Sequence, residues 1–384
     1  MDFELPEEHQ LLQQTLRDYV RDHVAPYATK YDEDESFPEI PWQKARELGL
    51  SAVTVPEEYG GTGMGHLAAS LVVEEISRVC PSTGVTLSVH NSLVCTPVAK
   101  WASEPLKKKY LPRLASGELL GAYALSEPEA GTDAANQRTR ATKQGDHWVL
   151  DGAKLWISSG THAGLFIVFA RTAEPPDVRH RSRGVTAFLV ERDTPGLKVG
   201  KKEEKLGIRA SPTTEVLFEN CVVPAENLLG ELDKGFHVAM DTLDGGRIGI
   251  ASQAVGITQG CLDASVKYAR ERQQFGRPIG DFQAIQWKLA EMATQLDAAR
   301  LLTRRAASIR DEGKPCTREA AMAKLFASQL SNRAADEAVQ IHGSAGYSRE
   351  YLVERLFRDA RITEIYEGAS DIQRIVIARK VLAT

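Results

Sequence analysis

The chain has 384 residues, of which 42% are hydrophobic and 26% are charged, so it can form two or three globular domains with a large buried core. Its formal net charge of −5 offers no basic balance for nucleic acid or an anionic membrane. Five widely spaced cysteines without a C-x-x-C argue against a disulfide framework and a zinc motif. The longest wholly apolar run without glycine is Leu165 to Ala170, which is far too short to span a membrane.

Residues 1–120 are predicted to form an N-terminal helical domain. Pro6 suits a first helical turn, and apolar residues follow it at helical spacing before Pro26. The glycine-rich run 59–65 is interpreted as a connector, because His66 stands where G-x-G-x-x-G requires its last glycine. A phosphate-binding role for this run remains the alternative.

Residues 121–230 change to the two-residue period of strands and are predicted to form a central β domain. Asp151-Gly152 lies between two apolar runs and predicts a hairpin turn. The charged, proline-containing stretch 171–184 is expected to be a surface loop. Further strands are expected at 166–170, 185–190 and 215–218.

Residues 231–384 return to the helical period. Two long stripes of apolar and small residues predict close-packed helices, and such stripes more often form a core or a subunit interface than a ligand site. The stripes are Ile285, Leu289, Met292, Leu296 and Ala299, and then Ala321, Leu325, Ser328, Asn332, Ala335 and Val339.

A last helix is expected to begin at Ser370. Ser370 and Gln373 have the spacing of a capping box, in which each side chain satisfies a backbone N–H at the start of the helix. The apolar residues of this helix are Ile372, Ile375, Val376 and Ile377.

Glu367 lies just before this helix, on a turn that contains Gly368. Apolar Ile365 and the Tyr366 ring flank it in sequence. A carboxylate in an apolar pocket is a weaker acid, so it can remove a proton from carbon near neutral pH. The alternative is an ordinary exposed glutamate. Other chemistries lack their motifs, since there is no P-loop, no H-E-x-x-H, no G-x-S-x-G and no histidine spacing for a metal.

Six unusual segments then occur in order along nearly the whole chain. Together they resemble the acyl-CoA dehydrogenase family, flavoproteins that desaturate acyl thioesters, and the third and sixth segments are most similar to short-chain, butyryl-type members. The segments are YALSEPEAGTD (123–133), KLWIS (154–158), LDGGRIGIASQAVG (243–256), RQQFGRPIGDFQ (272–283), QIHGSAGY (340–347) and RDARITEIYEGAS (358–370).

The resemblance implies an α+β fold, with an N-terminal helical domain, a central β domain and a C-terminal four-helix bundle over the three ranges 1–120, 121–230 and 231–384. It also implies a homotetramer with one FAD per subunit, bound between domains and partly by a neighbouring subunit. The expected partners are an acyl-CoA substrate and an electron-transferring flavoprotein. The expected location is the bacterial cytoplasm, or the mitochondrial matrix for a processed eukaryotic protein.

The resemblance also assigns roles residue by residue. Trp156 has a credible alternative as a β-domain core residue, and Asp244 with Arg247 as a local ion pair. His342 and Ala369 depart from the usual family residues, Leu and Thr. FAD contacts are implied for Tyr123, Leu125, Ser126, Gly131, Thr132, Trp156, Ser158, Arg272, Gln283, Gln340, His342, Gly343, Ser344, Ala369 and Asp371, and substrate contacts for Thr132, Asp244, Arg247 and Gly368.

Glu367 matches the catalytic base of the family. Some branches carry the base on a bundle helix instead, directly before the arginine that matches Arg247, but this chain has Gly246 there. The implied reaction is α,β-dehydrogenation of a short-chain acyl-CoA. The alternatives are a short branched-chain acyl-CoA dehydrogenase, an acyl-CoA oxidase, and a non-catalytic flavin- or DNA-binding relative.

Overall fold

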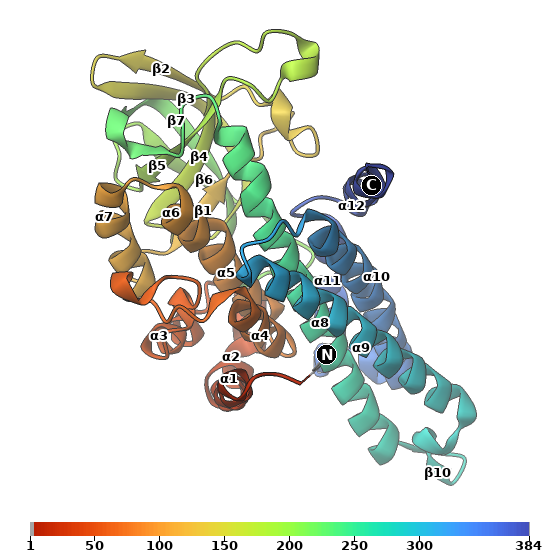
Figure 1. The fold of residues 1–384 in the computed structure, drawn as a ribbon. Coiled ribbons are helices and arrows are strands. Elements are labelled where there is room, and N and C mark those ends of the chain that lie inside the picture. Colours follow the sequence, from red (N-terminus) through yellow and green to blue (C-terminus); the bar gives the residue numbers. More distant parts are fainter. Residues whose placement is uncertain (1–3, 384) are drawn as a thin grey trace.

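The computed structural model describes residues 4–383, and it confirms the α+β organisation. The N-terminal part is helical and lies beside the sheet and the C-terminal helices (Figure 1). Its helices are α1 (Glu7–Tyr19), α2 (Ala25–Glu33), α3 (Glu39–Glu47), α4 (Gly65–Ser77), α5 (Pro81–Ser88), α6 (Thr96–Trp101) and α7 (Glu104–Ala115).

The first helical segment continues past Pro26. A π-helical turn at Val20–Val24 joins α1 to α2, and Pro26 falls in the first turn of α2, a position where proline is tolerated. The run 59–65 is a loop, and a side chain at Gly61 would collide with Val55. Close packing therefore accounts for that glycine.

The central part forms one mixed sheet in the order β6-β7-β3-β2-β4-β5-β8, with β1 paired in parallel to β4. The expected strands at 166–170, 185–190 and 215–218 are confirmed within longer strands. The strands are β1 (Gly121–Ala124), β2 (Arg140–Gln144), β3 (His147–Ser158), β4 (Leu165–Arg171), β5 (Val185–Glu191), β6 (Leu197–Lys202), β7 (Thr213–Pro224) and β8 (Leu228–Leu229).

The predicted hairpin at Asp151-Gly152 is wrong. β3 runs through both residues, and the turn is Gly145-Asp146, which joins β2 to β3. Gly152 is instead where the β3–β7 register shifts, and a Cβ there would come within 2.6 Å of Thr139 Oγ1. Gly152 therefore allows an irregularity within a continuous strand. Asp151 accepts a hydrogen bond from Asn220 N at 2.8 Å.

The C-terminal part contains three long helices, with α11 packed on two of them (Figure 1). Ala and Ser dominate the buried face of α10, so that the helices approach closely. The helices are α8 (Gly235–Glu271), α9 (Gln283–Asp311), α10 (Thr317–His342), α11 (Leu352–Ala360) and α12 (Ser370–Leu382), and the short strands β9 (Gln273–Gln274) and β10 (Arg277–Pro278) form a hairpin between α8 and α9.

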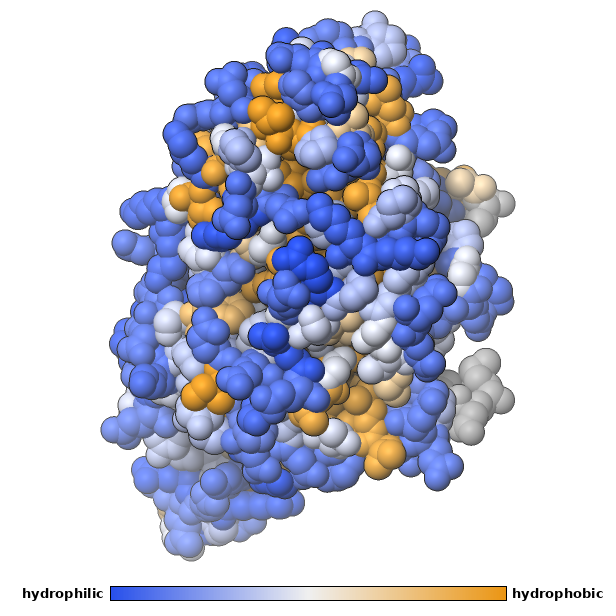
Figure 2. Space-filling view, turned by 90° about the vertical axis from the view of Figure 1, so that its left-hand side faces the viewer, coloured by the Kyte–Doolittle hydropathy of each residue, from blue (hydrophilic) through white to orange (hydrophobic). Residues whose placement is uncertain are grey.

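The surface differs between parts of the molecule. The face in Figure 2 is largely hydrophilic, with hydrophobic residues in small groups. In contrast, α12 carries exposed apolar side chains, with Ile375, Val381 and Leu382 exposed by 44%, 54% and 86%. Of the apolar residues expected on this helix, Ile375 is exposed and the other three, Ile372, Val376 and Ile377, are half-buried, so this chain alone does not cover them fully. No helix in the described range 4–383 is both long enough and apolar enough to cross a membrane.

Candidate active site

Glu367 lies in the turn that joins a 3₁₀ segment (Arg361–Glu364) to α12. Its φ is +51° and that of Gly368 is +99°, so two consecutive residues occupy the left-handed region that favours glycine. Such a conformation at a non-glycine residue persists only where its surroundings hold it. The surrounding structure therefore holds this turn in place, and the turn fixes the direction of the Glu367 side chain.

The predicted capping box is wrong. The residue that caps α12 is Ala369, and no side chain hydrogen-bonds to the first turn of the helix. Ser370 Oγ donates to Glu364 O at 3.4 Å, and Gln373 Nε2 donates to Gly368 O at 2.8 Å. The two polar side chains stabilise the turn before the helix instead of its first N–H groups.

The Glu367 carboxylate points at α8, at the position of Gly246. A Cβ at Gly246 would collide with Glu367 Oε2. This oxygen is buried and has no hydrogen-bond partner. Burial raises the pKa of Glu367 to about 7, although the positive charges of Lys324 and Arg247 act in the opposite direction. The carboxylate therefore has the property expected of a base that works near neutral pH.

An apolar cluster lies around this turn. Tyr123 from β1 and Tyr366 both pack against it, and the Tyr366 hydroxyl donates to Gln253 Oε1 on α8. The charge of Glu367 helps to raise the pKa of both tyrosines, so both rings lie near the carboxylate. Ile365, expected in the same pocket, is 50% exposed. The buried members of the cluster are Val85, Val89, Leu93, Ile208 and Ile250.

Asp244 and Arg247 form a buried ion pair one turn apart on α8, with 2.5 Å between Oδ1 and Nη1. Thr317 Oγ1 donates to the other Asp244 oxygen at 2.6 Å, whereas Arg247 Nε is buried without a partner. The local ion pair that the sequence left open therefore exists. The unpartnered Nε still leaves Arg247 able to donate to a ligand.

A second group of expected site residues lies in and after β1 and at the end of β3. Trp156 is 59% exposed and has a φ of +61°, so its alternative as a core residue is wrong. Leu155 N donates to Ser126 O at 2.9 Å and ties the two segments together. Of the others, Leu125 is buried, Ser126 and Ser158 are half-buried, and Gly131 and Thr132 are exposed.

A buried ion pair that the sequence did not predict holds these two segments. Lys154 Nζ donates to Glu127 Oε1 at 2.7 Å, to Leu125 O at 3.1 Å and to Gln137 Oε1 at 3.2 Å. Lys154 is fully buried, and burial lowers its pKa to about 8. Glu127 also accepts a backbone N–H bond at 3.0 Å from Thr139. Both charged residues stand inside the family-like motifs, and that position was the available signal.

Replacing Lys154 with Met is expected to lower the free energy of unfolding by about 3–5 kcal/mol, because it leaves the buried Glu127 without its charged partner. The measurement is urea unfolding of the purified variant. Lys201→Met, at an exposed position of β6, is the matched control and should change stability by under about 0.5 kcal/mol. Equal stability of the two variants would contradict the importance of the pair.

A third group of expected cofactor residues lies at the other end of α8. Arg272 follows the last residue of this helix and is exposed, as is Gln283 at the start of α9. α8 has 37 residues, or about 55 Å at 1.5 Å per residue, and it begins against β5. Figure 1 shows β10 far from the sheet. A single chain therefore does not bring this group to Trp156.

The residues at the end of α10 divide in two. Gln340, Gly343 and Ser344 are exposed, whereas His342 is buried. The His342 ring stacks on Tyr268 with 4.3 Å between ring centroids, and Nδ1 lies 2.7 Å from Ala338 O. The His342 ring is therefore held by contacts within this chain. In the Glu367 turn, Ala369 is half-buried, and the exposed Asp371 pairs with Arg374 at 2.7 Å.

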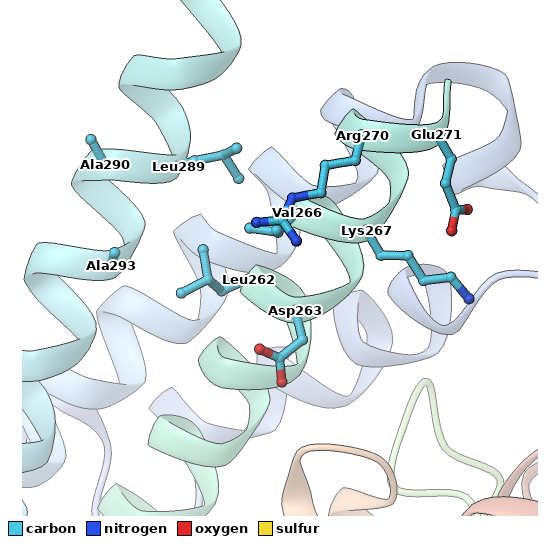
Figure 3. Close-up of a pocket in the computed structure, with 9 residues that line it drawn as sticks. All are labelled: Leu262, Asp263, Val266, Lys267, Arg270, Glu271, Leu289, Ala290 and Ala293. Atoms are coloured by element: carbon cyan, nitrogen blue, oxygen red, sulfur yellow. The ribbon is translucent and has the colours of Figure 1, made fainter. Parts of the chain in front are cut away.

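A groove of about 640 Å³ lies between α8 and α9 near the same end of the bundle (Figure 3). Leu289 from α9 points toward Val266 and Arg270 from α8, and charged side chains line the rim. None of its lining residues belongs to the Glu367 turn or to the apolar cluster. The groove is therefore separate from the chemistry of the carboxylate. Within residues 4–383 no group of His, Cys, Asp or Glu side chains could hold a metal ion.

Comparisons with known proteins identify the family of the chain. Three family models match: acyl-CoA dehydrogenase N-terminal domain over residues 6–118, middle domain over 122–221 and C-terminal domain over 233–382. The chain is 51% identical over 379 residues to "Short-chain specific acyl-CoA dehydrogenase, mitochondrial" of Mus musculus, in a match that covers 99% of this chain and 91% of the relative.

Two solved structures are similar over the full length of both chains. Butyryl-CoA dehydrogenase from Megasphaera elsdenii has a TM-score of 0.96 and 43% identity. A chain in a structure described as "Electron transferring flavoprotein of Acidaminococcus fermentans: Towards a mechanism of flavin-based electron bifurcation" has a TM-score of 0.97 and 44% identity.

Proposed function

This chain belongs to the acyl-CoA dehydrogenase family of oxidoreductases, and from that premise we propose that it dehydrogenates a short-chain acyl-CoA to a trans-2-enoyl-CoA with FAD as cofactor. The observation that carries the proposal is the Glu367 carboxylate. Its Oε2 is buried and has no hydrogen-bond partner, and its pKa is raised to about 7. An orphaned carboxylate oxygen of this kind suits proton removal from carbon.

The proposed cofactor fits the residues present. The exposed Trp156 ring, on a residue with a positive φ, offers a flat surface, and the half-buried Ser126 and Ser158 offer polar groups from the same two segments. Arg272 offers a planar cation for a pyrophosphate. Bound FAD would supply a two-electron acceptor for the β-hydrogen of the substrate. The roles of Tyr123, Leu125, Gly131, Thr132, Gln283, Gln340, His342, Gly343, Ser344, Ala369 and Asp371 as further FAD contacts belong to the same proposal.

The mechanism assigned to the chain begins with proton removal. Glu367 takes the α-proton of the thioester onto its free oxygen. The backbone N–H of Glu367 has no acceptor among the described residues, so it can donate to the thioester carbonyl as negative charge develops there. Thr132, Asp244, Arg247 and Gly368 are proposed to hold the CoA thioester, and the buried Arg247 Nε is free to do so.

The proposed short-chain preference rests on the residues beyond Gly246 along α8. Ile250 and Gln253 stand one and two turns further on the same side of the helix, so an acyl chain that starts beside Gly246 would run toward them. Gln253 is fully buried, accepts from the Tyr366 hydroxyl and donates to Pro81 O at 2.9 Å. We propose that this hydrogen-bonded pair limits the acyl site to a short chain.

Replacing Gln253 with Ala is expected to increase kcat/KM for octanoyl-CoA relative to butyryl-CoA by about tenfold or more, because methylene discrimination is worth about 10–200-fold. The measurement is kcat/KM for a series of straight-chain thioesters. Gln259→Ala, further along α8, is the control and should leave the ratio unchanged. An unchanged ratio in both variants would place the limit of the acyl site elsewhere.

The pH dependence follows from the raised pKa of Glu367. The base works only when ionised, so kcat/KM should rise with pH through about 7 and level off above it. Because the folded-state pKa lies above the ordinary value of 4.5, the contribution of this group to stability is full below 4.5 and is lost as pH rises through about 7. A kcat/KM profile that is flat between about pH 5.5 and 8 would contradict this assignment.

Product analysis tests the proposed reaction. Butyryl-CoA incubated with the FAD-loaded enzyme and an electron acceptor should lose two hydrogens, seen by mass spectrometry as a product about two mass units lighter. Reaction driven by an electron-transferring flavoprotein without hydrogen peroxide supports the dehydrogenase, whereas stoichiometric peroxide in air supports an oxidase. Unchanged butyryl-CoA, with turnover of isobutyryl-CoA, would move the substrate to the branched class.

The proposal includes an oligomer, because Arg272 follows α8 directly before the β9–β10 hairpin, Trp156 belongs to β3, and Figure 1 shows β10 far from the sheet, so a second copy is needed for the two to meet around one cofactor. A homotetramer is the proposed state. The named relatives include a mitochondrial and a bacterial protein, and the proposed location is accordingly the mitochondrial matrix or the bacterial cytoplasm.

A further inference from the structure

Lys324 is a fully buried lysine on α10 beside the Glu367 turn. The residues one turn before and after it on the same face of the helix are small, Ala320, Ala321, Ala327 and Ser328, all buried. A buried ammonium among small side chains costs solvation and persists only where it is compensated. We propose that Lys324 is a positioning residue for Glu367, which holds the Glu367–Gly368 turn through the Gly368 carbonyl and keeps the neighbouring carboxylate ionised. This inference rests on the proposed role of Glu367 as the base.

The first part of the proposal is mechanical. Gly368 O accepts two hydrogen bonds, from Lys324 Nζ at 2.8 Å and from Gln373 Nε2 at 2.8 Å. The turn they hold has positive φ at both Glu367 and Gly368. Charged donors make the stronger hydrogen bonds, so Lys324 supplies the larger share of this support. Without it, Glu367 could relax toward ordinary backbone angles and move its carboxylate away from Gly246.

The second part is electrostatic. None of the ion pairs within 4.0 Å in the described part of the chain involves Lys324, so its charge acts on Glu367 through space. Among the positive charges it is the strongest influence that lowers the Glu367 pKa, ahead of Arg247. The other ionisable groups that face this region are Asp244 on α8, Tyr123 on β1, and Glu364 and Tyr366 on the segment of Glu367 itself.

Those other groups do not replace the lysine. Arg247 is already paired with Asp244 at 2.5 Å, and Glu364 with Arg361. The pKa of Lys324 is lowered to about 8 by burial, so the ammonium is present at neutral pH. Among the described residues near Glu367, Lys324 is therefore the one cation without a carboxylate within 4.0 Å.

Two substitutions separate the two parts. Lys324→Met removes both the hydrogen bond and the charge, whereas Gln373→Leu removes the other hydrogen bond to the same carbonyl and keeps the charge. For Lys324→Met, the acidic limb of kcat/KM should move to higher pH by about one unit or more. For Gln373→Leu, kcat should fall while the acidic limb of the kcat/KM profile stays at the same pH. Lys324→Arg should restore the limb, because it restores a cation.

An infrared titration gives a second readout that does not need turnover. The carbonyl band of protonated Glu367, identified by its loss in Glu367→Gln, should persist to higher pH in Lys324→Met than in the unmodified protein. A folded Lys324→Met variant with both the band and the limb unmoved would overturn the proposal. If this variant does not fold, Lys324→Gln removes the same charge with a polar side chain and takes its place. The titration also works if butyryl-CoA is not the substrate, so failure of the proposed function would be seen separately.

Discussion

Replacing Glu367 with Gln is expected to reduce turnover of butyryl-CoA by about 10²–10⁴-fold while FAD binding and ligand binding persist. Gln keeps the size and the backbone of the turn but cannot take a proton. Because Oε2 has no hydrogen-bond partner, the substitution breaks no hydrogen bond at that atom. The measurement is the rate of flavin reduction in a single turnover under anaerobic conditions.

Glu350→Gln is the matched control, since Glu350 is an exposed glutamate in the same C-terminal part of the chain. It should reduce the flavin at the unmodified rate. Near-normal flavin reduction by Glu367→Gln would show that the base lies elsewhere, and the proposed mechanism would then be wrong.

Replacing Gly246 with Ala is expected to lower kcat for butyryl-CoA by about 10²-fold, because displacement of a reacting group by about 1 Å can cost that much. The added Cβ would collide with Glu367 Oε2 and lie 2.8 Å from Leu93 Cδ2. The carboxylate must move, since the α8 backbone is fixed by packing on both sides. Circular dichroism and thermal unfolding would establish that the helix is intact.

Gly245→Ala is the control for this experiment. A Cβ at Gly245 meets nothing closer than Arg310 Nε at 3.4 Å, an ordinary contact. Alanine in a helix interior is about 0.5–1 kcal/mol better than glycine, so this variant should be at least as stable and should keep its kcat. Similar losses in both variants would mean that helix distortion, and not the carboxylate, is responsible.

The order of helical and β parts could be read from the sequence because each has a long, clear hydrophobic period. Every residue of β4 is buried, so this strand appears in the sequence as an apolar run. The helical spacing of apolar residues in α9 likewise indicates a helix from the sequence alone. The hairpin at Asp151-Gly152 was wrong because the same dipeptide also suits an irregularity within a strand. Only the partner strand β7, far along the chain, distinguishes the two.

The candidate base could be predicted because Glu367 stands in a recognisable motif, but its supports could not. The capping-box spacing of Ser370 and Gln373 is a local rule, whereas Gln373 in fact donates to the carbonyl of Gly368. Lys324 and Lys154 were missed because a lysine is assumed to face solvent. Lys324 directly precedes Leu325, a member of the predicted stripe on α10. The residues of α10 that are buried at helical spacing include Lys324, so the periodicity of the helix predicts its burial if lysine is not assumed to be exposed.

The resemblance implied a cofactor bound partly by a neighbouring subunit, and the separation of the expected FAD residues agrees with that expectation, which hydrophobic periodicity alone could not provide. Arg272 and Trp156 both belong to specific motifs, yet Arg272 lies beside the β9–β10 hairpin and Trp156 in the sheet, and Figure 1 shows β10 far from the sheet. The chain also leaves apolar side chains uncovered, on α12 and at Phe275, which is 93% exposed. Exposed apolar surface of this kind is typical of an interface with another molecule. The proposed site is therefore shared between copies of the chain.

The most direct test is the absorbance spectrum of the purified, FAD-loaded protein, recorded without oxygen before and after addition of butyryl-CoA. We expect a yellow flavin spectrum that bleaches within the mixing time of a stoichiometric addition. A protein that remains colourless after incubation with FAD, or a flavin spectrum that persists with butyryl-CoA and with a panel of longer and branched thioesters, would contradict the proposed function.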